Sequence, residues 1–444
     1  MFKGDESRGL NPSTRFIQVA FGALACALVT LAPEVQAKGI QLQEPTSSNQ
    51  TTTHSTVATI AEELVIATAL EHLHEQRLTT ASFLSQIATI VSPSGHERER
   101  AEAVAHKMRE VGLESVVVDD TPNVIGVIPG RSEKALVFIA TLDDLATVTI
   151  HQKAATEPPR IDGDRLVGPG TNTSSTSAAI LAAAAALITA GFQPEHDLVF
   201  AAVAQEETGL VGMKALYEQY KDRAIGFIDV LGDGRRISYG AIGIHWWKII
   251  AEGPPGHSLS GGLPNVNQGI ARAVDRILQL PHPETYSDSR TVINVSVLQS
   301  GSVFNHKPST GWFSLDIRSL DNKVIQTIET AVQAELLQVS QETGITLTME
   351  AFQLTPGGQI PGARMSRLVT TAEAIAKYLG LEPTVSNRGS SNMNVAIGNG
   401  TPAIGLGGSR GGDRAQSTEW ADISAMMRTA SHVVLLAAIL GMSD

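Results

Sequence analysis

Residues 197–210, DLVFAAVAQEETGL, join a buried strand to a pair of adjacent acids, and this segment indicates the fold class. The run from Asp197 to Ala204 is almost entirely apolar, which is typical of a strand buried on both faces of a sheet. Glu206 and Glu207 follow directly. Adjacent carboxylates at the end of a buried strand indicate a functional site there, because one can face a metal ion while the other faces water.

Other buried strands alternate with helices on either side of this segment. Ala135–Ala140 and Ile225–Leu231 are strands of the same apolar type, and Thr176–Ala190 is a helix built mostly of Ala, Leu and Ile. Earlier, 57–112 has helical spacing with a break at 92–95. The alternation predicts an α/β domain whose mostly parallel sheet is flanked by helices.

The order of elements changes at about residue 243. The predicted elements are a strand at Ile244–Ala251, a helix at Asn265–Leu280, strands at Thr291–Gln299 and Trp312–Arg318, a helix at Lys323–Thr343 and a strand at Ile345–Phe352. This βαββαβ order predicts a ferredoxin-like insert, 243–353, between two parts of the α/β domain, 57–242 and 354–444. In the second part we expect a helix at Ala363–Leu379, a strand at Pro402–Leu406 and a helix at Trp420–Leu440.

The composition describes a globular protein that does not bind nucleic acid. Hydrophobic residues make up 42% of the chain and charged residues only 18%, which argues against disorder. The formal net charge is -12, and there is no basic stripe that could follow a phosphate backbone.

The N-terminus is predicted to be an export signal, residues 1–37. Three basic residues precede an apolar run at 16–32, and Val35-Gln36-Ala37 fits a small-residue cleavage site. Cleavage would place the mature chain in the periplasm or outside the cell, without a membrane contact. The alternative is an uncleaved membrane anchor. The polar stretch 38–56 is predicted to be a flexible linker. Cys26 is the only cysteine, so the mature chain would have no disulfide and no thiolate ligand.

Three further motifs connect the chain with a known family. They are Gly168-Pro169-Gly170-Thr171-Asn172, Phe227-Ile228-Asp229 and Glu419-Trp420. With the segment at 205–210, the chain resembles the zinc peptidases that include aminoacylase, glutamate carboxypeptidase and tripeptidase T. The resemblance is strongest to the branch of tripeptidase T. The resemblance extends from about residue 80 to 444. It implies a zinc exopeptidase fold, a pair of zinc ions, hydrolysis of short peptides or N-acyl amino acids, and a homodimer formed through the insert.

The resemblance assigns roles to four acids. Glu206 matches the general base, Glu207 and Asp229 match metal ligands, and Asp143 matches the acid that orients a zinc-bound His. Alternatively, Glu206 and Glu207 cap the helix that follows, and Asp229 lies in a turn at a strand end.

Three of the five family positions for metal ligands are lost. Thr141 stands in place of a His, Thr173 in place of the bridging Asp, and Ala415 in place of the second His. Asn172 offers only a weak carbonyl ligand, and Gln416 fits only if the alignment slips by one. These losses argue against a conventional pair of zinc ions.

The remaining acids leave two interpretations of the site. Glu206, Glu207, Asp229 and Asp143 form an all-oxygen set, which suits a single hard cation such as Ca²⁺, Mg²⁺ or Mn²⁺. Without a metal the carboxylates must take up protons or find another cation, and Arg414, beside Ala415, is a candidate counter-ion.

The resemblance also implies residues that contact the substrate. His257 matches the insert His that stabilises the oxyanion in the partner subunit's site, while Asn305 and Arg318 match positions that bind the substrate backbone and carboxylate. Alternatively, His257 is a surface residue, and Arg318 forms a salt bridge with Asp316 or Asp321.

Two glycine- and serine-containing loops complete the expected pocket. Residues 390–392 and 405–408 resemble loops that line the family's site. The segment 407–411 also matches Gly-x-Ser-x-Gly, but a polar stretch follows where a serine hydrolase needs a helix, and only His432 comes later in the chain.

Three hypotheses follow. The first is an exported homologue that binds short peptides with little or no hydrolysis. The second is an active metallopeptidase with an altered, single-metal site. The third is a structural or interaction protein that forms homodimers.

Overall fold

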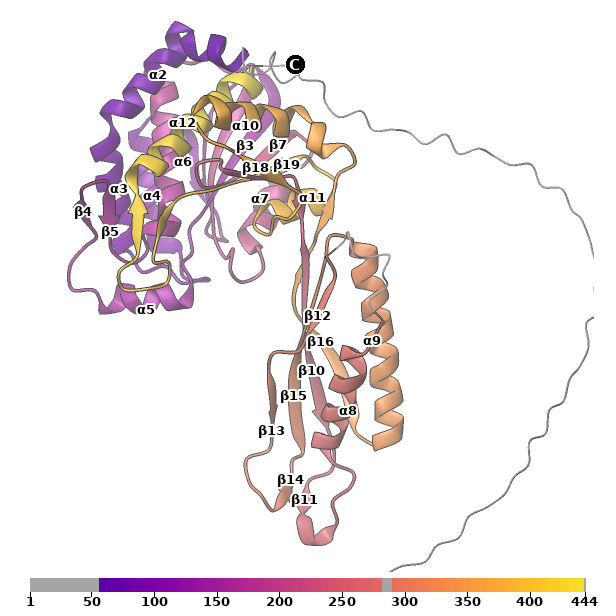
Figure 1. The fold of residues 1–444 in the computed structure, drawn as a ribbon. Helices are drawn as coiled ribbons and strands as arrows, with labels where there is room; N and C mark the ends of the chain where they lie inside the picture. Colours follow the sequence, from indigo (N-terminus) through magenta and orange to yellow (C-terminus); the bar gives the residue numbers. More distant parts are fainter. Residues whose placement is uncertain (1–55, 282–289, 443–444) are drawn as a thin grey trace, which may run out of the picture. The chain divides into compact units, whose positions relative to one another are not determined.

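The computed structural model describes residues 56–281 and 290–442, and its largest element is an eight-stranded mixed sheet (Figure 1). The strand order is β1-β2-β6-β3-β7-β19-β8-β18. The strands are β1 (Glu114–Val118), β2 (Val124–Ile128), β3 (Ser132–Thr141), β6 (His196–Val203), β7 (Ala224–Leu231), β8 (Arg236–Ser238), β18 (Thr384–Ser386) and β19 (Ala403–Gly407). The central strands β6, β3, β7 and β19 run parallel, whereas β1, β2 and the β19–β8 pairing are antiparallel. The predicted α/β fold is confirmed.

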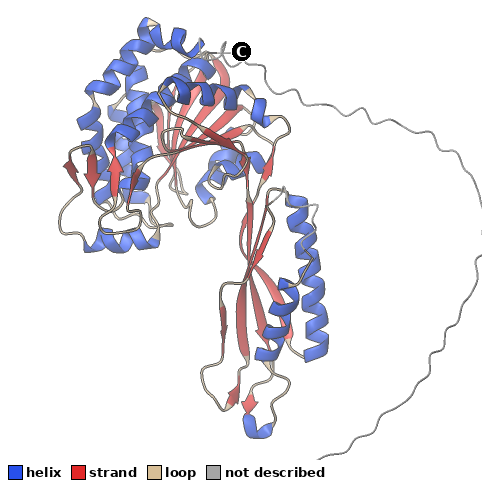
Figure 2. Ribbon diagram, in the orientation of Figure 1, coloured by secondary structure: helices blue, strands red, loops and turns tan. Residues whose placement is uncertain are grey.

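Helices cover both faces of this sheet (Figure 2). They are α2 (Leu64–Glu75), α3 (Arg77–Thr89), α4 (Arg98–Glu110), α5 (Ala146–Ala154), α6 (Thr171–Thr189), α7 (Val211–Tyr220), α10 (Arg367–Tyr378), α11 (Met393–Gly398) and α12 (Ile423–Leu440). One face of the sheet packs with α4, α6, α10 and α12 in the larger core, and the other packs with α7 and α11. The second face is covered less completely, and the candidate site lies there.

Helix α6 begins five residues before the predicted start at Thr176. Its first turns are polar but buried, because their hydroxyl groups bond to nearby backbone carbonyls. Thr171 donates to the carbonyl of Gly168 at 2.8 Å and Ser175 to that of Asn172 at 2.7 Å. The spacing of apolar residues therefore predicted only the later part of helix α6.

The insert has the predicted βαββαβ order. Its elements are β10 (Gly243–Glu252), α8 (Val266–Leu278), β12 (Val292–Asn294), β13 (Leu298–Ser300), β15 (Thr310–Ser319), α9 (Asn322–Thr343) and β16 (Thr346–Thr355). The antiparallel sheet has the order β12-β15-β10-β16, with α8 and α9 packed on one face. A short hairpin of β11 (Gly256–His257) and β14 (His306–Lys307) is added. That the insert forms a dimer interface remains a prediction.

The strand predicted at Thr291–Gln299 is two short strands, β12 and β13. Between them the ladder to β15 is interrupted, because the Ser314 hydroxyl accepts from the backbone N–H groups of Ser296 and Val297 at 3.2 and 3.0 Å. A side chain thus takes over part of the backbone pairing, while the Ser314 N–H still donates to the Val297 carbonyl at 2.9 Å.

The C-terminal elements are confirmed, but two helices begin later than predicted. Helix α10 begins at Arg367 instead of Ala363, because Ala363–Met365 forms a separate 3-10 turn and the Ser366 side chain caps α10. Helix α12 begins at Ile423, three residues after the predicted start, because Trp420–Asp422 forms strand β21 in a small sheet ordered β20-β21-β5-β4. The other strands of that sheet are β4 (Arg160–Asp162), β5 (Arg165–Val167) and β20 (Gly411–Gly412). The Asp422 side chain accepts from the N–H of Ala425 at 2.8 Å and caps α12.

Helix α12 is long and apolar enough to cross a membrane by length and composition, but 78% of it is buried within the protein. It packs against α6, α2 and α10, as a core helix does. The predicted signal, 1–37, lies outside the described residues, as does the predicted linker apart from Thr56.

Candidate functional site

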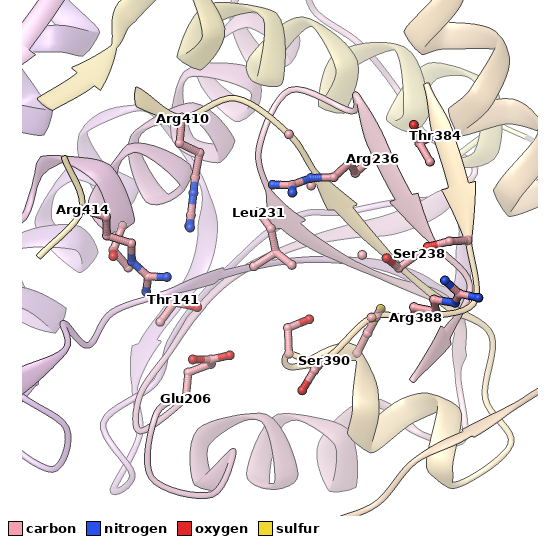
Figure 3. A pocket seen from close by; sticks show the side chains of 18 of the residues that line it. Thr141, Glu206, Leu231, Arg236, Ser238, Thr384, Arg388, Ser390, Arg410 and Arg414 are labelled. Atoms are coloured by element: carbon pink, nitrogen blue, oxygen red, sulfur yellow. The ribbon is translucent and has the colours of Figure 1, made fainter. Parts of the chain in front are cut away.

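A pocket of about 450 Å³ opens at the ends of the central strands (Figure 3). Its lining comes from the ends of β3 and β7, the loop after β6, the start of α6, strand β8, the edge strand β18 and the loops around β19. The carboxyl ends of parallel strands are where α/β proteins usually bind ligands. The pocket is therefore the candidate site, and it includes the paired acids of the opening segment.

Glu206 and Glu207 lie in a loop that Asp143 holds in place. The fully buried Asp143 carboxylate accepts from the N–H of Glu206 at 2.9 Å and from that of Glu207 at 3.1 Å. It also accepts a short hydrogen bond from the Ser94 hydroxyl. In this chain Asp143 therefore positions the loop that carries Glu206 and Glu207. The predicted role of Asp143, to orient a metal ligand at position 141, stays a prediction.

Asp229 is fully buried, and its oxygens are bonded to the segment before α11. It accepts from the N–H of Met393 at 3.2 Å and lies 3.5 Å from the Asn392 side-chain nitrogen, which also donates to Thr141 Oγ1 at 3.3 Å. Burial raises the Asp229 pKa to about 6. These bonds occupy only part of the carboxylate's lone-pair sites.

Two of the three positions at which the sequence predicts a lost metal ligand line the pocket. Thr141 and Thr173 line the pocket with hydroxyl groups, and Ala415 donates its N–H to Glu419 Oε2 at 3.1 Å. Neither Asn172 nor Gln416 is among the lining residues. Within residues 56–281 and 290–442, no group of three or more His, Cys, Asp or Glu side chains could hold a metal ion. Of the His, Cys, Asp and Glu side chains in the described residues, Glu206 and Glu207 are the ones that line this pocket.

Two arginines bring positive charge to the acids instead. Arg414 Nη2 lies 3.1 Å from Glu207 Oε1, so the predicted counter-ion does pair with the cluster. The Arg410 side chain points into the pocket on the same side as Glu206 and Arg414 (Figure 3). In the described part of the chain it forms no ion pair, and burial lowers its pKa to about 10, so it stays charged at neutral pH.

Replacing Arg414 by alanine is expected to change stability little and peptide binding more. The ion pair with Glu207 is partly exposed, so its loss should lower the free energy of unfolding by no more than about 1 kcal/mol. The dissociation constant of a short peptide should rise severalfold, because a pocket cation is lost. Urea unfolding and calorimetry measure the two effects, and no change in either would refute the counter-ion role.

The protonation of Glu206 responds to the same surroundings. Burial, followed by the charges of Glu207, Asp229 and Asp143, raises the Glu206 pKa from 4.5 to about 8. At neutral pH its carboxyl group keeps a proton, and so it is a hydrogen-bond donor and a poor general base.

Stability should therefore depend on Glu206 between about pH 4.5 and 8. In this window the folded protein holds a proton that the unfolded chain has released, so the free energy of unfolding falls as pH rises. The wild type should lose stability relative to Glu206→Gln on going from pH 5 to pH 8. Urea unfolding of both proteins at each pH measures the difference, and a difference that is independent of pH would contradict the raised pKa.

His257, Asn305 and Arg318 belong to the insert and do not line the pocket. His257 Nε2 lies 3.2 Å from the Asn305 side-chain nitrogen, so these two predicted residues lie together. Arg318 Nε donates to both oxygens of Asp316 at 3.0 and 3.1 Å, as in the salt bridge considered above. Their roles in binding substrate remain predictions.

The predicted loops do line the pocket, through Ser390, Ser391 and the glycines of β19. The serine hydrolase alternative gains no support. The N–H of Ser409 donates to Asp233 at 3.1 Å, and strand β20 follows instead of a helix. His432 Nδ1 faces the backbone carbonyl of Asp233 at 3.3 Å, and burial lowers its pKa to about 4.

Sequence reasoning missed one side of the pocket. Arg410 lies in a segment that the sequence analysis described only by its glycines and its Gly-x-Ser-x-Gly pattern. The polar residues of β8 and β18 were not predicted to belong to the site. The residues concerned are Arg236, Ser238, Thr384, Ser386 and Arg388. A strand of three residues contains too few positions for a periodic signal, so only the fold reveals their proximity.

One family model and several known proteins are similar to this chain in sequence. The model of the family "Peptidase family M20/M25/M40" matches residues 145–438. Carboxypeptidase G2 from Pseudomonas sp. is 26% identical over 326 residues, which cover 70% of this chain and 75% of the relative. Succinyl-diaminopimelate desuccinylase from Corynebacterium glutamicum is 24% identical over 331 residues, covering 72% and 86%.

Solved structures share the fold at lower identity. A tripeptidase from Staphylococcus aureus superimposes with a TM-score of 0.69 at 18% identity, covering 82% of this chain and 98% of that one. The aminopeptidase PepT from Bacillus cereus gives 0.68 at 20% identity with the same coverage. A Bacillus subtilis protein described as a dinuclear metal binding peptidase gives 0.62 at 15% identity, covering 83% and 99%.

Proposed function

Because this chain belongs to peptidase family M20/M25/M40, we propose that it binds short peptides or N-acyl amino acids and hydrolyses them slowly or not at all. Relatives and neighbours of the chain are named carboxypeptidase, aminopeptidase and tripeptidase. These names support a peptide ligand. The chemistry of the pocket supports binding without metal-assisted hydrolysis.

One observation carries the proposal: arginines accompany the retained acids where a metal pair would need ligands. Arg414 pairs with Glu207, and the charged Arg410 side chain enters the pocket beside Glu206. Metal-assisted hydrolysis needs a cation that both activates water and polarises the carbonyl. A guanidinium group donates hydrogen bonds to an anion but holds no water as a metal does.

The side chains of the pocket suit a peptide with a free carboxylate. Arg410 offers a planar set of donors that matches a carboxylate. Hydroxyl groups of Thr141, Thr173 and Ser390 can bond the peptide's amide groups, and Leu231 adds an apolar surface. The chain's own residues thus bind and orient a peptide, and none of them is placed to activate water.

Calorimetry with matched peptides tests the proposal on the purified full chain. The probes are the dipeptides Ala-Gln and Ala-Glu and the tripeptides Ala-Ala-Gln and Ala-Ala-Glu, each with zinc and with EDTA. We expect binding that zinc and EDTA leave unchanged, and intact peptide by mass spectrometry after incubation. Zinc-dependent cleavage, or no binding of any of the four peptides, would contradict the proposal.

Export of the chain and a homodimer formed through the insert accompany this proposal. The basic and apolar pattern of residues 1–37 supports export, and the ferredoxin-like order of the insert supports the dimer. Cell fractionation tests the first, and light scattering of the purified chain tests the second. A protein found in the cytoplasm or a monomeric mass would contradict the respective part.

A further inference from the structure

One wall of the pocket is built from a single face of adjacent strands. In β18 and β8, Thr384 lies opposite Arg236 and Ser386 opposite Ser238. Since alternate residues of a strand point to the same face, these four side chains share one surface. Together with Arg388, which follows β18, they form what we name the arginine–hydroxyl wall.

Glycines of β19 keep the space in front of this wall open. Gly405 and Gly407 lie opposite Ser238 and Arg236 on the same face, and both line the pocket. A Cβ at Gly405 would come 2.9 Å from Met393 Sδ, so no side chain fits there without displacing that methionine. Gly405 thus leaves room for Met393, and a ligand can extend from Glu206 to the wall because both line the same pocket.

The wall carries positive charge without acidic partners. Among the described residues, neither Arg236 nor Arg388 forms a salt bridge, although the neighbouring Arg235 pairs with Asp233 at 3.2 Å. The two acids that line the pocket, Glu206 and Glu207, come from the loop after β6, and Figure 3 shows Glu206 on the opposite side from Arg388. Two guanidinium groups with nearby hydroxyls are a suitable site for a carboxylate.

We infer that the arginine–hydroxyl wall binds a second carboxylate of the ligand, so that the preferred ligands are acidic peptides or N-acyl derivatives of acidic amino acids. The inference rests on the proposed peptide-binding function and gives its ligand class. One carboxylate contacts Arg410, and the other contacts Arg236 or Arg388, whose guanidinium groups lie at different ends of the wall in Figure 3. A larger polyanion is disfavoured, because Glu206 and Glu207 line the same pocket and the chain has a net charge of -12.

Ala-Glu and Ala-Gln differ by one carboxylate at nearly constant shape, so they isolate this contact. We expect the full chain to bind Ala-Glu about fivefold or more tightly than Ala-Gln at neutral pH, since the wall is partly exposed. Arg236→Gln and Arg388→Gln should each reduce this preference, and the double variant should remove it, so that Ala-Glu binds no more tightly than Ala-Gln.

Arg109→Gln is the matched control, because it removes the same charge from an exposed position on α4 away from the pocket. It should keep the full preference for Ala-Glu. Equal binding of both dipeptides by the wild type would overturn the inference and leave the proposed function standing. A preference that survives in the double variant would also overturn it. If neither dipeptide binds, the dicarboxylate inference fails, and the proposed function then depends on the tripeptides.

Discussion

Replacing Arg410 by glutamine is expected to raise the dissociation constant of Ala-Gln about thirtyfold. Arg410 enters the pocket without an ion pair to the described residues, and it is charged at neutral pH. In the wild type, this partly desolvated guanidinium group can bind the carboxylate of the ligand. The variant offers a neutral amide and leaves the negative charges of Glu207 and Asp229 less balanced, so an anionic ligand is repelled.

Arg410→Lys separates the charge from the shape of the side chain. Lysine keeps the charge but lacks the planar donor pair, so its dissociation constant should lie between those of the wild type and Arg410→Gln. Calorimetry at low salt measures all three, and circular dichroism verifies that each variant is folded. A change of less than about threefold in Arg410→Gln would show that the ligand carboxylate binds elsewhere.

Replacing Arg100 by methionine is expected to lower the free energy of unfolding by about 3–5 kcal/mol. Arg100 and Asp144 are buried, with side-chain exposures of 1% and 0%, and Arg100 Nη2 lies 2.6 Å from Asp144 Oδ2. Arg100 Nη1 also donates to the carbonyl of Leu142 at 2.8 Å. Removing the arginine leaves a buried acid without its cation, and the Leu142 carbonyl keeps only the Ser92 hydroxyl as a donor, at 3.1 Å.

The double variant Arg100→Met with Asp144→Leu tests this explanation. Replacing both partners by apolar residues removes the unpaired charge, so the double variant should be more stable than Arg100→Met alone. Urea unfolding measures both. A loss of less than about 1 kcal/mol in the single variant, or a double variant that is still less stable, would contradict the ion pair's role.

This buried pair also connects the core to the candidate site. Asp144 donates its N–H to the carbonyl of Ser92 at 2.8 Å, next to the segment whose Ser94 bonds to Asp143. Asp143 in turn holds the loop of Glu206 and Glu207. Arg100→Met should therefore weaken peptide binding as well, even though Arg100 does not line the pocket.

The sequence predicted the elements that have strong apolar patterns. Strands β3, β6 and β7 lie within three residues of their predicted bounds, because a parallel strand buried on both faces needs an apolar run. The insert was predicted because its helices and strands are long enough to show their periods. Strands β8 and β18 have three residues each, of which only Ile237 and Val385 are aliphatic, and no pattern marked them.

The candidate site, like the fold, was predicted only in part from the sequence. The positions of Glu206, Glu207 and Asp229 could be predicted from motifs that are continuous in the sequence, and the loss of metal ligands at Thr141 and Thr173 stays a prediction from the same motifs. The arginines that line the pocket could not be predicted, because they come from segments that are distant in the sequence. Arg236 and Arg410 lie far apart in the chain and line one pocket only because β8 and β19 are adjacent in the sheet.

The metal content of the purified chain tests the central claim most directly. The claim is that arginines accompany the retained acids in a pocket that lacks the ligands for a metal pair. The full chain is equilibrated with Zn²⁺, Mn²⁺ and Ca²⁺ in turn, desalted and analysed for each element. We expect well under one ion per chain with every metal; one hard cation per chain would support an altered metal site, and two zinc ions per chain would contradict the account.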